Sequence, residues 1–364
     1  MKKFLPLFLL LALTAACGRG RSADAADAGD TLRLHHARNL TIVEYANRTE
    51  VTIRNPWDTL KTMARYCLYD GKQSPGTDAG YRVVVPLQRA AVFSSVHCAL
   101  FHELQADSAV GGICDIEFFN LPYYKEGVAE GRIANLGNSM QPNVEQIINL
   151  NPAAIMPSPF ENSGGLGRVE RLGFPIIWCA DYMESTPLGR AEWMRFYGRL
   201  VGRARMADSI FSAIESRYLQ LCKEAAGTKT RPRLLPEMPW SGQWTLPGSG
   251  SSSSVLYADA GAEYLFSHLK GAGGIPLSTE KVVDKAVDAD IWLIKHHGRL
   301  DRKQMVADTP LLEGIKAPIW WCDTSETLIY EETPFHPERL LENLIAILHP
   351  ELGITSDYQY FKPL

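Results

Sequence analysis

One segment of this chain, residues 189–227, is longer than an ordinary helix and repeats apolar side chains at helical spacing over most of its length. The apolar positions are Trp193, Phe196, Tyr197, Leu200, Ile210, Phe211, Ile214, Tyr218 and Leu221. A chain of 364 residues exceeds one ordinary domain, so a folded half is expected on each side of the segment. The pattern therefore predicts two lobes joined by a long, rigid helix, and Gly202 is the place where that helix would break.

Both flanking halves alternate short apolar runs with helical patterns, as βαβ units with buried parallel strands do. In the first half we expect strands at 81–86, 109–115, 153–156 and 174–181, and helices at 90–105, 142–150 and 164–173. In the second half we expect strands at 231–238, 290–295 and 317–323, and helices at 255–269, 278–287 and 336–350. The fold class is therefore α/β, with two three-layer α/β lobes.

The domain boundaries follow from these patterns. Residues 38–188 form the N-terminal lobe, 189–227 the connecting helix and 228–364 the C-terminal lobe. Two alternating runs at 40–54 meet at Asn47-Arg48, which predicts a β-hairpin added before the first lobe.

The N-terminus has the composition of an export signal. Residues 1–17 carry two lysines, an apolar stretch and then small residues, and are too short to span a membrane. The segment "LTAAC" resembles a bacterial lipobox, which would make Cys17 the acylated residue; cleavage after Ala16 by an ordinary signal peptidase is the alternative. Residues 18–37 read as a flexible tether. We therefore expect a lipid-anchored protein on the periplasmic side of a bacterial membrane.

Several function classes are disfavoured by composition and motifs. Forty-one acidic and 37 basic residues give a net charge of −4 without a basic run, which argues against nucleic acid. No CxxC pair occurs, so a thiolate metal site is not expected, and "FHELQA" lacks the second histidine of a zinc protease. We predict no catalytic residue, no resident metal and no cofactor. "GSGSSSS" at 248–254 is either a surface loop or a cleft loop that donates hydrogen bonds to a ligand.

Four segments occur in an order that resembles one family. They are "PNVEQIINLNPAAIM", "EWMRFYGRLVG", "LSTEKVVDKAVDADIWLI" and "ERLLENLIAILHPEL". Together they resemble the helical-backbone class of substrate-binding proteins of bacterial ABC importers, which capture iron–siderophore complexes, cobalamin and haem. The resemblance spans roughly residues 81–352, and it departs from the family pattern at Ala153-Ala154 and at the added hairpin. It implies a monomeric binding protein, not an enzyme, that delivers its ligand to a permease dimer with its ATPase.

The resemblance also implies two docking residues. Glu145 in "PNVEQI" and Glu280 in "LSTEKV" each lie in the first turn of a helix that precedes a buried strand. A carboxylate near a helix N-terminus is favoured by the helix dipole alone. Both halves of the chain carry such a glutamate at an equivalent place, and this parallel placement favours docking. The resemblance implies that each glutamate meets arginines of one permease subunit.

The ligand is expected between the lobes, at the carboxyl ends of the strands. The candidates in the first lobe are Arg89, Phe118, Phe119, Tyr123, Tyr124, Phe160 and Tyr182, and those in the second lobe are Trp240, Trp244 and His296. Aromatic rings at a cleft suit a large planar or amphipathic ligand, and a guanidinium suits an anionic one. Each aromatic residue has an alternative place in the core.

The identity of the ligand is less constrained. Cobalamin binders of the resembled family carry Trp at the places held here by Ser139 and Gly274, and haem binders often carry Tyr where "NLGNSMQ" has none. A metal chelate, most readily a ferric siderophore, is therefore the leading hypothesis. Cobalamin, haem and a bare metal ion are the alternatives. A lipoprotein without an importer and a metal-handling enzyme on the same fold are the rival classes.

Overall fold

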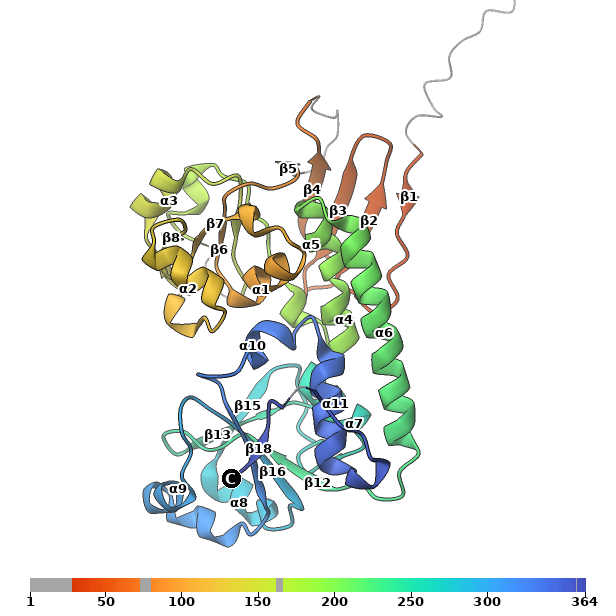
Figure 1. The fold of residues 1–364 in the computed structure, drawn as a ribbon, viewed down its shortest axis with the longest axis vertical. Helices are drawn as coiled ribbons and strands as arrows, with labels where there is room; N and C mark the ends of the chain where they lie inside the picture. Colours follow the sequence, from red (N-terminus) through yellow and green to blue (C-terminus); the bar gives the residue numbers. More distant parts are fainter. Residues whose placement is uncertain (1–27, 73–79, 162–165, 358) are drawn as a thin grey trace, which may run out of the picture.

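The computed structural model describes residues 28–72, 80–161, 166–357 and 359–364, which form two stacked lobes joined by a long helix (Figure 1). Cys17, the signal segment and most of the predicted tether lie outside the described residues. No helix in the described ranges is both long enough and apolar enough to cross a membrane.

The N-terminal lobe is a three-layer unit around a small parallel sheet. The sheet has the strand order β11 (Ile155–Met156), β6 (Ala90–Val92), β7 (Val110–Ile113) and β8 (Ala134–Asn135). Its helices are α1 (Ser95–Glu103), α2 (Pro122–Ala129) and α3 (Val144–Leu150). One face of the sheet packs with Phe101 and Tyr124, and the other packs with Ile147 and Leu150 of α3. The strands β6, β7 and β11 are apolar throughout because both faces are covered, whereas the edge strand β8 carries the exposed Asn135.

A second sheet is added to this lobe and is larger than the predicted hairpin. Its order is β1 (Asp30–Thr31), β2 (Leu40–Glu44), β3 (Thr49–Arg54), β4 (Thr62–Tyr69) and β5 (Tyr81–Val84). The β2–β3 hairpin is confirmed. The strand predicted at 81–86 is β5, which pairs with β4 of this sheet rather than with the lobe's parallel sheet. The inner face packs on the connecting helices, where the Tyr66 ring stacks on Phe196 at 6.0 Å.

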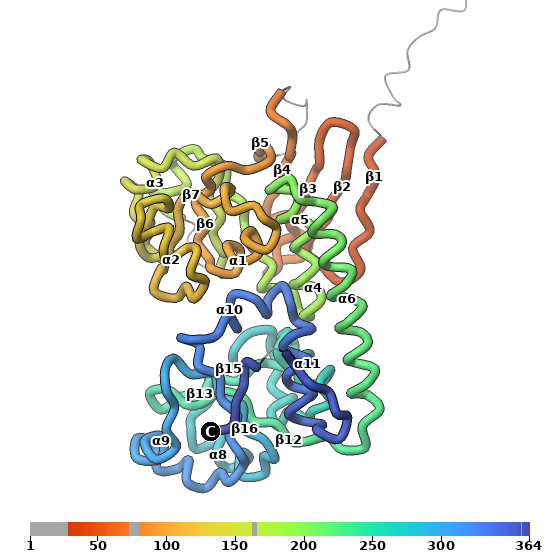
Figure 2. Tube along the Cα trace, in the orientation of Figure 1, coloured from red at the N-terminus to blue at the C-terminus, as the bar shows by residue number. Residues whose placement is uncertain are grey.

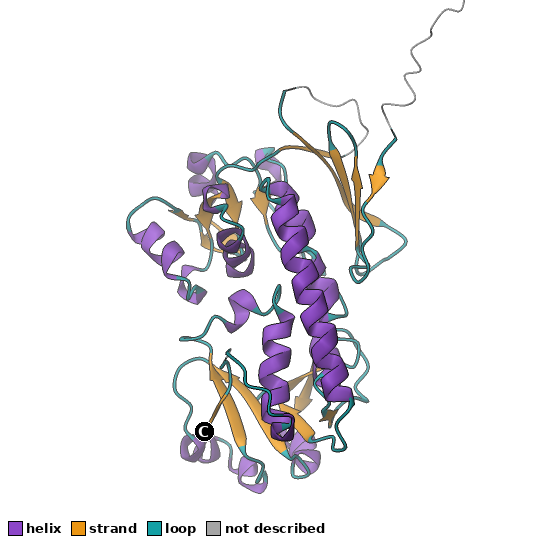
Figure 3. Cartoon of the chain, turned by 45° about the vertical axis from the view of Figure 1, so that its right-hand side comes forward, coloured by secondary structure: helices purple, strands orange, loops and turns teal. Residues whose placement is uncertain are grey.

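The predicted connecting helix consists of three helices. They are α4 (Pro187–Glu192), α5 (Met194–Leu200) and α6 (Ala204–Ala226). Gly202 has φ +69°, which only glycine adopts readily, and the chain breaks there. The strut is therefore α6 alone, which runs along both lobes in Figures 1 and 3. Gly198 of α5 allows this helix to pack closely against Ala207 of α6.

The C-terminal lobe has a mostly parallel sheet in the order β14 (Glu263–Tyr264), β12 (Arg233–Pro236), β16 (Ile291–His296), β17 (Ile319–Asp323) and β18 (Lys362–Pro363). Only β18 is antiparallel to its neighbour. The helices are α7 (Ser252–Asp259), α8 (Thr279–Ala286), α9 (Arg302–Asp308), α10 (Ile329–Glu332) and α11 (Pro337–Leu348). Figure 1 places α6, α7 and α11 on one side of the sheet and α8 and α9 on the other. An antiparallel pair, β13 (Gln243–Pro247) and β15 (Gly274–Ser278), lies beside them.

Several predicted elements differ from the structure. The helix predicted at 90–105 begins as strand β6, and the strand at 174–181 is reduced to one bridge, Ile155 to Ile176. Within the described part of 164–173 there is only a 3-10 turn, Glu170–Leu172. The helix predicted at 255–269 ends near Gly261, whose φ of +79° does not fit a helix.

The segment before β2 is held in place by buried carboxylates. Glu192 of α4 accepts hydrogen bonds from the backbone N–H groups of His35, His36 and Ala37, at 2.7–3.0 Å. Glu184 accepts hydrogen bonds from the backbone N–H groups of the next two residues, Arg38 and Asn39. The predicted flexible tether therefore does not extend over this part of residues 18–37.

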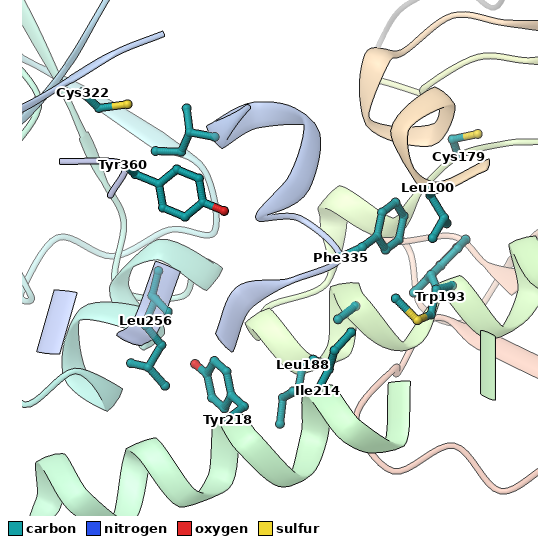
Figure 4. Packing of buried hydrophobic residues seen from close by; sticks show 14 of the residues in the cluster. Leu100, Cys179, Leu188, Trp193, Ile214, Tyr218, Leu256, Cys322, Phe335 and Tyr360 are labelled. Atoms are coloured by element: carbon teal, nitrogen blue, oxygen red, sulfur yellow. The ribbon is translucent and has the colours of Figure 1, made fainter. Parts of the chain in front are cut away.

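The two lobes touch beyond α6. Glu331 of α10 accepts hydrogen bonds from the N–H groups of Asn120 at 2.7 Å and Leu121 at 3.1 Å. His336 lies 2.8 Å from a carboxylate oxygen of Glu103 on α1. Figure 2 shows α10 directly beneath α1, and Figure 4 shows apolar side chains of both lobes packed at this junction. The lobes are thus joined along α6 and along α1–α10.

Candidate ligand-binding cleft

A cavity of about 890 Å³ lies between the lobes. The N-terminal lobe lines it with residues next to the 3-10 turn Asp181–Met183, and the C-terminal lobe lines it with residues that follow β12 and end β16. The polar and aromatic lining residues are Trp57, Glu161, Tyr182, Glu184, Ser185, Glu237, Trp240, Gln243, Thr245, Ser251, Ser252, Ser253, Lys295 and Tyr330. This is the carboxyl-end position expected for a ligand in open α/β sheets.

One ion pair dominates the electrostatics of this cavity. Lys295 Nζ lies 2.7 Å from a carboxylate oxygen of Glu237, and the Tyr330 ring centre is 5.9 Å from the same nitrogen. Burial opposes the charge on the lysine, but Glu237 more than compensates, and the pKa of Lys295 is raised. The lysine therefore stays charged, and its charge is already neutralised by a protein carboxylate.

Hydroxyl groups and backbone amides line the other side of the cavity. Ser251 is the N-cap of α7, and its side chain accepts a hydrogen bond from Ser254 N at 3.2 Å. Ser252 and Ser253 follow in the first turn and face the cavity together with Gly250. Residues 250–253 of "GSGSSSS" line the cavity, although α7 already begins at Ser252; hydrogen bonding to a ligand stays a prediction.

A smaller cavity of about 270 Å³ lies in the N-terminal lobe, at the carboxyl ends of β6, β7 and β11. Asp115, which follows β7, orients the loop there by accepting a hydrogen bond from Ser139 N at 3.0 Å. Phe118 and Phe160 line it with 67% and 41% of their surface exposed. Exposed rings beside a polar wall can contact an amphipathic ligand.

The structure brings part of the predicted ligand set to these cavities. Tyr182 and Trp240 line the large cavity from opposite lobes. Phe118, Phe119 and Phe160 line the smaller one, although Phe119 is only 1% exposed.

Three predicted ligand contacts are corrected by their positions. Tyr124 is fully buried and donates its hydroxyl hydrogen to the Cys98 carbonyl at 2.8 Å. Trp244 is fully buried beside Trp292, with ring centres 5.6 Å apart. Arg89 precedes β6 and therefore lies at the amino edge of the sheet, away from the cavity. These aromatic rings form the core, which was the alternative.

Two further candidates lie at other surfaces. Tyr123 packs against His102 at 5.3 Å and below the guanidinium of Arg132 at 5.2 Å, and does not line the described cavities. His296 lines a cavity of about 400 Å³ that shares Trp240 with the large one. Its Nδ1 lies 3.0 Å from the Gly298 carbonyl oxygen.

Sequence reasoning missed the residues that give the large cavity its chemistry. Lys295 in "IWLIKHH" is a cation at the end of a buried strand, which is a signal that could have been read. Glu237 follows β12 with φ +63°, an uncommon backbone conformation for glutamate. Trp57 belongs to the added sheet, and nothing in its local sequence indicates that it reaches the cleft.

The two predicted docking residues are exposed and similarly placed. Glu145 lies in the first turn of α3, and Glu280 lies in the first turn of α8. Within the described residues neither carboxylate forms an ion pair. Figure 1 places α3 and α8 in different lobes, on the side of the molecule away from α6.

Comparisons with known proteins agree on the fold. Residues 105–318 match the family model described as periplasmic binding protein. An uncharacterised lipoprotein of Methanocaldococcus jannaschii is 27% identical over 281 residues, covering 73% of this chain but only 66% of the relative, just under two thirds of its length. A second uncharacterised lipoprotein of that organism is 22% identical over 315 residues, covering 82% of this chain and 79% of the relative.

Solved structures with the same fold have low sequence identity. A periplasmic heme-binding protein from Pseudomonas aeruginosa superposes with a TM-score of 0.60 at 16% identity, covering 76% of this chain and 98% of its own. A periplasmic vitamin B12-binding protein of Vibrio cholerae superposes with a TM-score of 0.54 at 14% identity, covering 74% of this chain and 99% of its own. A Helicobacter pylori protein with bound Ni(II) superposes with a TM-score of 0.56 at 16% identity, covering 75% of this chain and 88% of its own. At such identities the likeness carries the fold and not the ligand.

Proposed function

The chain belongs to the periplasmic binding protein family, and from this premise we propose that it captures a metal chelate, with a ferric siderophore as the first candidate, and delivers it to an ABC importer. It is an extracytoplasmic binding protein rather than an enzyme.

The observation that carries the proposal is the interlobe cavity. Its volume of about 890 Å³ is within the range of small-molecule sites, roughly 300–1,000 Å³, and far above the size of a bare ion. Tyr182, Trp240 and Tyr330 offer aromatic faces, and Ser252 and Ser253 offer hydroxyl groups. This combination suits a chelate that has both apolar and hydrogen-bonding surface.

The alternatives differ in what supports them. Among the described residues no cluster of three or more His, Cys, Asp or Glu side chains could hold a metal ion, which counts against bare-metal binding. Cobalamin and haem are also amphipathic and would suit the same aromatic walls, so they remain the alternatives within the proposal.

The ligand is tested with the full exported protein. Native mass spectrometry of protein isolated from cell extract measures any bound mass, and calorimetry compares ferrioxamine B, ferric enterobactin, cyanocobalamin and haemin. We expect one iron chelate to bind with a Kd of about 1 μM or tighter, which corresponds to about −8 kcal/mol. Binding of none of the four probes, together with no bound mass, contradicts chelate capture.

Delivery to a permease is supported by Glu145 and Glu280. Both carboxylates are exposed, lie in first helical turns of different lobes, and have no ion-pair partner in the described structure. A permease that contacts both at once would recognise the relative arrangement of the lobes. Charge pairs at such an interface set the association rate and the orientation of docking.

Charge reversal tests this role. Glu145→Arg and Glu280→Arg are expected to leave the fold and ligand affinity unchanged while uptake of the radiolabelled chelate falls at least tenfold, with the double variant lowest. Glu224→Arg on α6 is the matched control, since α6 lies on the other side of the molecule. Uptake that survives both reversals, or affinity that falls with them, contradicts the docking role.

Membrane attachment through Cys17 is part of the proposal. It is supported by the "LTAAC" segment and by two relatives that are called lipoproteins. Cys17→Ala should move the protein from the membrane to the soluble fraction, because the acyl chains supply the membrane affinity. A wild-type protein that is already soluble, with an unmodified N-terminus, contradicts lipid anchoring.

A further inference from the structure

The connection between β3 and β4 is a folded loop. We call residues 55–61 the Trp57 loop. The Asn55 side chain accepts hydrogen bonds from Trp57 N at 2.9 Å and Asp58 N at 3.2 Å, and Asn55 N donates to the Lys61 carbonyl at 2.9 Å. Asp58 in turn accepts from Leu60 N at 3.3 Å. Such side-chain-to-backbone bonds fix a turn before any ligand arrives.

The Trp57 loop borders the interlobe cavity. The half-buried side chain of Trp57 lines the cavity together with Tyr182 of the N-terminal lobe and Trp240 of the C-terminal lobe. Leu60 of the same loop does not line it and is 98% exposed. One loop thus presents one large side chain to the cavity and another to solvent.

The sheet that carries the loop is tied to the cavity wall. Glu184 lines the cavity, is 3% exposed, and accepts hydrogen bonds from Arg38 N and Asn39 N just before β2. It also accepts from Trp193 Nε1 at 3.0 Å. The Asn39 carbonyl in turn accepts a hydrogen bond from Arg54 N, and Arg54 directly precedes the Trp57 loop. The position of Trp57 is therefore fixed relative to the cleft.

Trp240 on the opposite wall is fixed in a comparable way. It precedes the two-residue turn Ser241-Gly242, in which both residues have positive φ, and it exchanges two backbone hydrogen bonds with Gln243 at 2.7 and 3.0 Å. This is the geometry of a tight hairpin turn. Its side chain is 80% exposed. Two tryptophans whose backbones are fixed by hydrogen bonds thus line one cavity from different parts of the fold.

The charges around the cavity restrict the ligand further. In the described lining, the carboxylates of Glu161, Glu184 and Glu237 accompany one cation, Lys295, which Glu237 already pairs. An anionic ligand would meet no uncommitted cation there. A neutral or cationic ligand would meet aromatic faces and the carboxylate of Glu161, since Glu184 and Glu237 already have partners. Aromatic rings also attract cationic groups.

We propose that the Trp57 loop is a third wall of the cleft, and that Trp57 selects neutral or cationic chelates by packing its ring on the ligand. The family match begins at residue 105, so this wall comes from a part of the chain that the match does not cover. The inference rests on the proposed function and names the ligand's charge class and a specificity-determining residue.

The test compares binding of cationic ferrioxamine B, anionic ferric enterobactin and neutral cyanocobalamin to three variants. We expect Trp57→Ala to weaken the tightest-binding probe about tenfold, which is about 1.4 kcal/mol, and Trp57→Phe to restore it to within about threefold. Leu60→Ala in the same loop is the matched control and should bind as the wild type does. Circular dichroism and Tm of the variants exclude a folding defect.

The outcomes separate the two proposals. Wild-type protein that binds none of these probes or haemin, and carries no bound mass, overturns the proposed function and this inference with it. Wild-type binding that Trp57→Ala leaves unchanged overturns the third wall alone. Tightest binding of ferric enterobactin overturns the charge selection. If Trp57→Ala weakens probe binding and Trp57→Phe weakens it equally, ring packing is not the cause of the lost affinity.

Discussion

A charge cluster with a buried centre, Asp181 and His97, lies at the junction of the lobes and gives a stability prediction. Asp181 lies 2.8 Å from His97 Nε2 and 3.1 Å from Arg190 Nε, and it accepts a hydrogen bond from the Tyr197 hydroxyl at 2.8 Å. His97 also packs against Phe335 of the C-terminal lobe at 5.9 Å. The perturbation is Asp181→Asn, which keeps the shape and an acceptor for Tyr197 but removes the charge.

The magnitude follows from the titration of the cluster. Burial would lower the pKa of His97, but the Cys179 sulfur and the Asp181 carboxylate raise it from 6.5 to about 10. Such a rise corresponds to at most about 5 kcal/mol of stability. Burial would raise the pKa of Asp181, yet His97 and Arg190 hold it well below its ordinary value. Removing one partner of a buried ion pair costs about 3–5 kcal/mol, and we expect a loss in that range.

The sign of the pH dependence is fixed by the direction of these shifts. Because the folded pKa of His97 lies above its unfolded value, its contribution is complete below about pH 6.5 and is lost as the pH rises through about 10. The stability difference between wild type and Asp181→Asn should therefore be largest near pH 6 and shrink toward pH 10.

Urea unfolding of both proteins at pH 6, 8 and 10 measures this difference. Asp290→Asn is the matched control, because Asp290 forms an exposed pair with Arg233 and should cost less than about 1 kcal/mol. A cost of Asp181→Asn no greater than that of the control, or a cost that does not shrink as the pH rises, would contradict a stabilising role of this charge pair.

Three further predictions concern the lobes and the strut. Burial raises the pKa of Glu331, so ionisation of this carboxyl group lowers the free energy of unfolding as the pH rises above about 4.5. Glu331→Gln should nevertheless weaken the hydrogen bonds that Glu331 accepts from Asn120 N and Leu121 N. Hydrogen exchange should become faster at those two amides and stay unchanged in α8. Gly198→Ala would place a Cβ 2.4 Å from that of Ala207, and this overpacking should cost about 1–3 kcal/mol in calorimetry; an unchanged Tm would contradict it. X-ray scattering curves of free and loaded protein should nearly superimpose, because α6 and the α10 contact restrict lobe closure, and a large compaction would contradict that.

Elements with a strong local signal were predictable from the sequence. The run Ile291-Trp292-Leu293-Ile294 is buried on both sides and is strand β16, and α8 and α11 fall within two residues of their predicted bounds. The strand β5 has an equally clear pattern, but its partner is β4 of the added sheet. Pairing depends on tertiary contacts that a local pattern does not contain.

The site was less predictable, because an aromatic residue near a strand end has the same local sequence signal in the core and in a cleft. Phe118 is 67% exposed and lines a cavity, whereas Tyr124, six residues later, is fully buried. Trp57 lines the cleft, and the sheet that carries it is bound there by Glu184, which accepts a hydrogen bond from Asn39, 145 residues earlier. Such long-range hydrogen bonds leave no trace in the local sequence.

The same contacts explain how selectivity can arise without a large motion. The lobes are joined along α6 and again where Glu331 meets the backbone of Asn120 and Leu121. A cleft held on two sides cannot adapt much to its ligand, so its walls must already have the right shape and charge. The backbones of Trp57 and Trp240 are both fixed by local hydrogen bonds, which favours such preset walls. The specificity that we propose therefore rests on aromatic walls, one of which comes from a sheet outside the family-matched region.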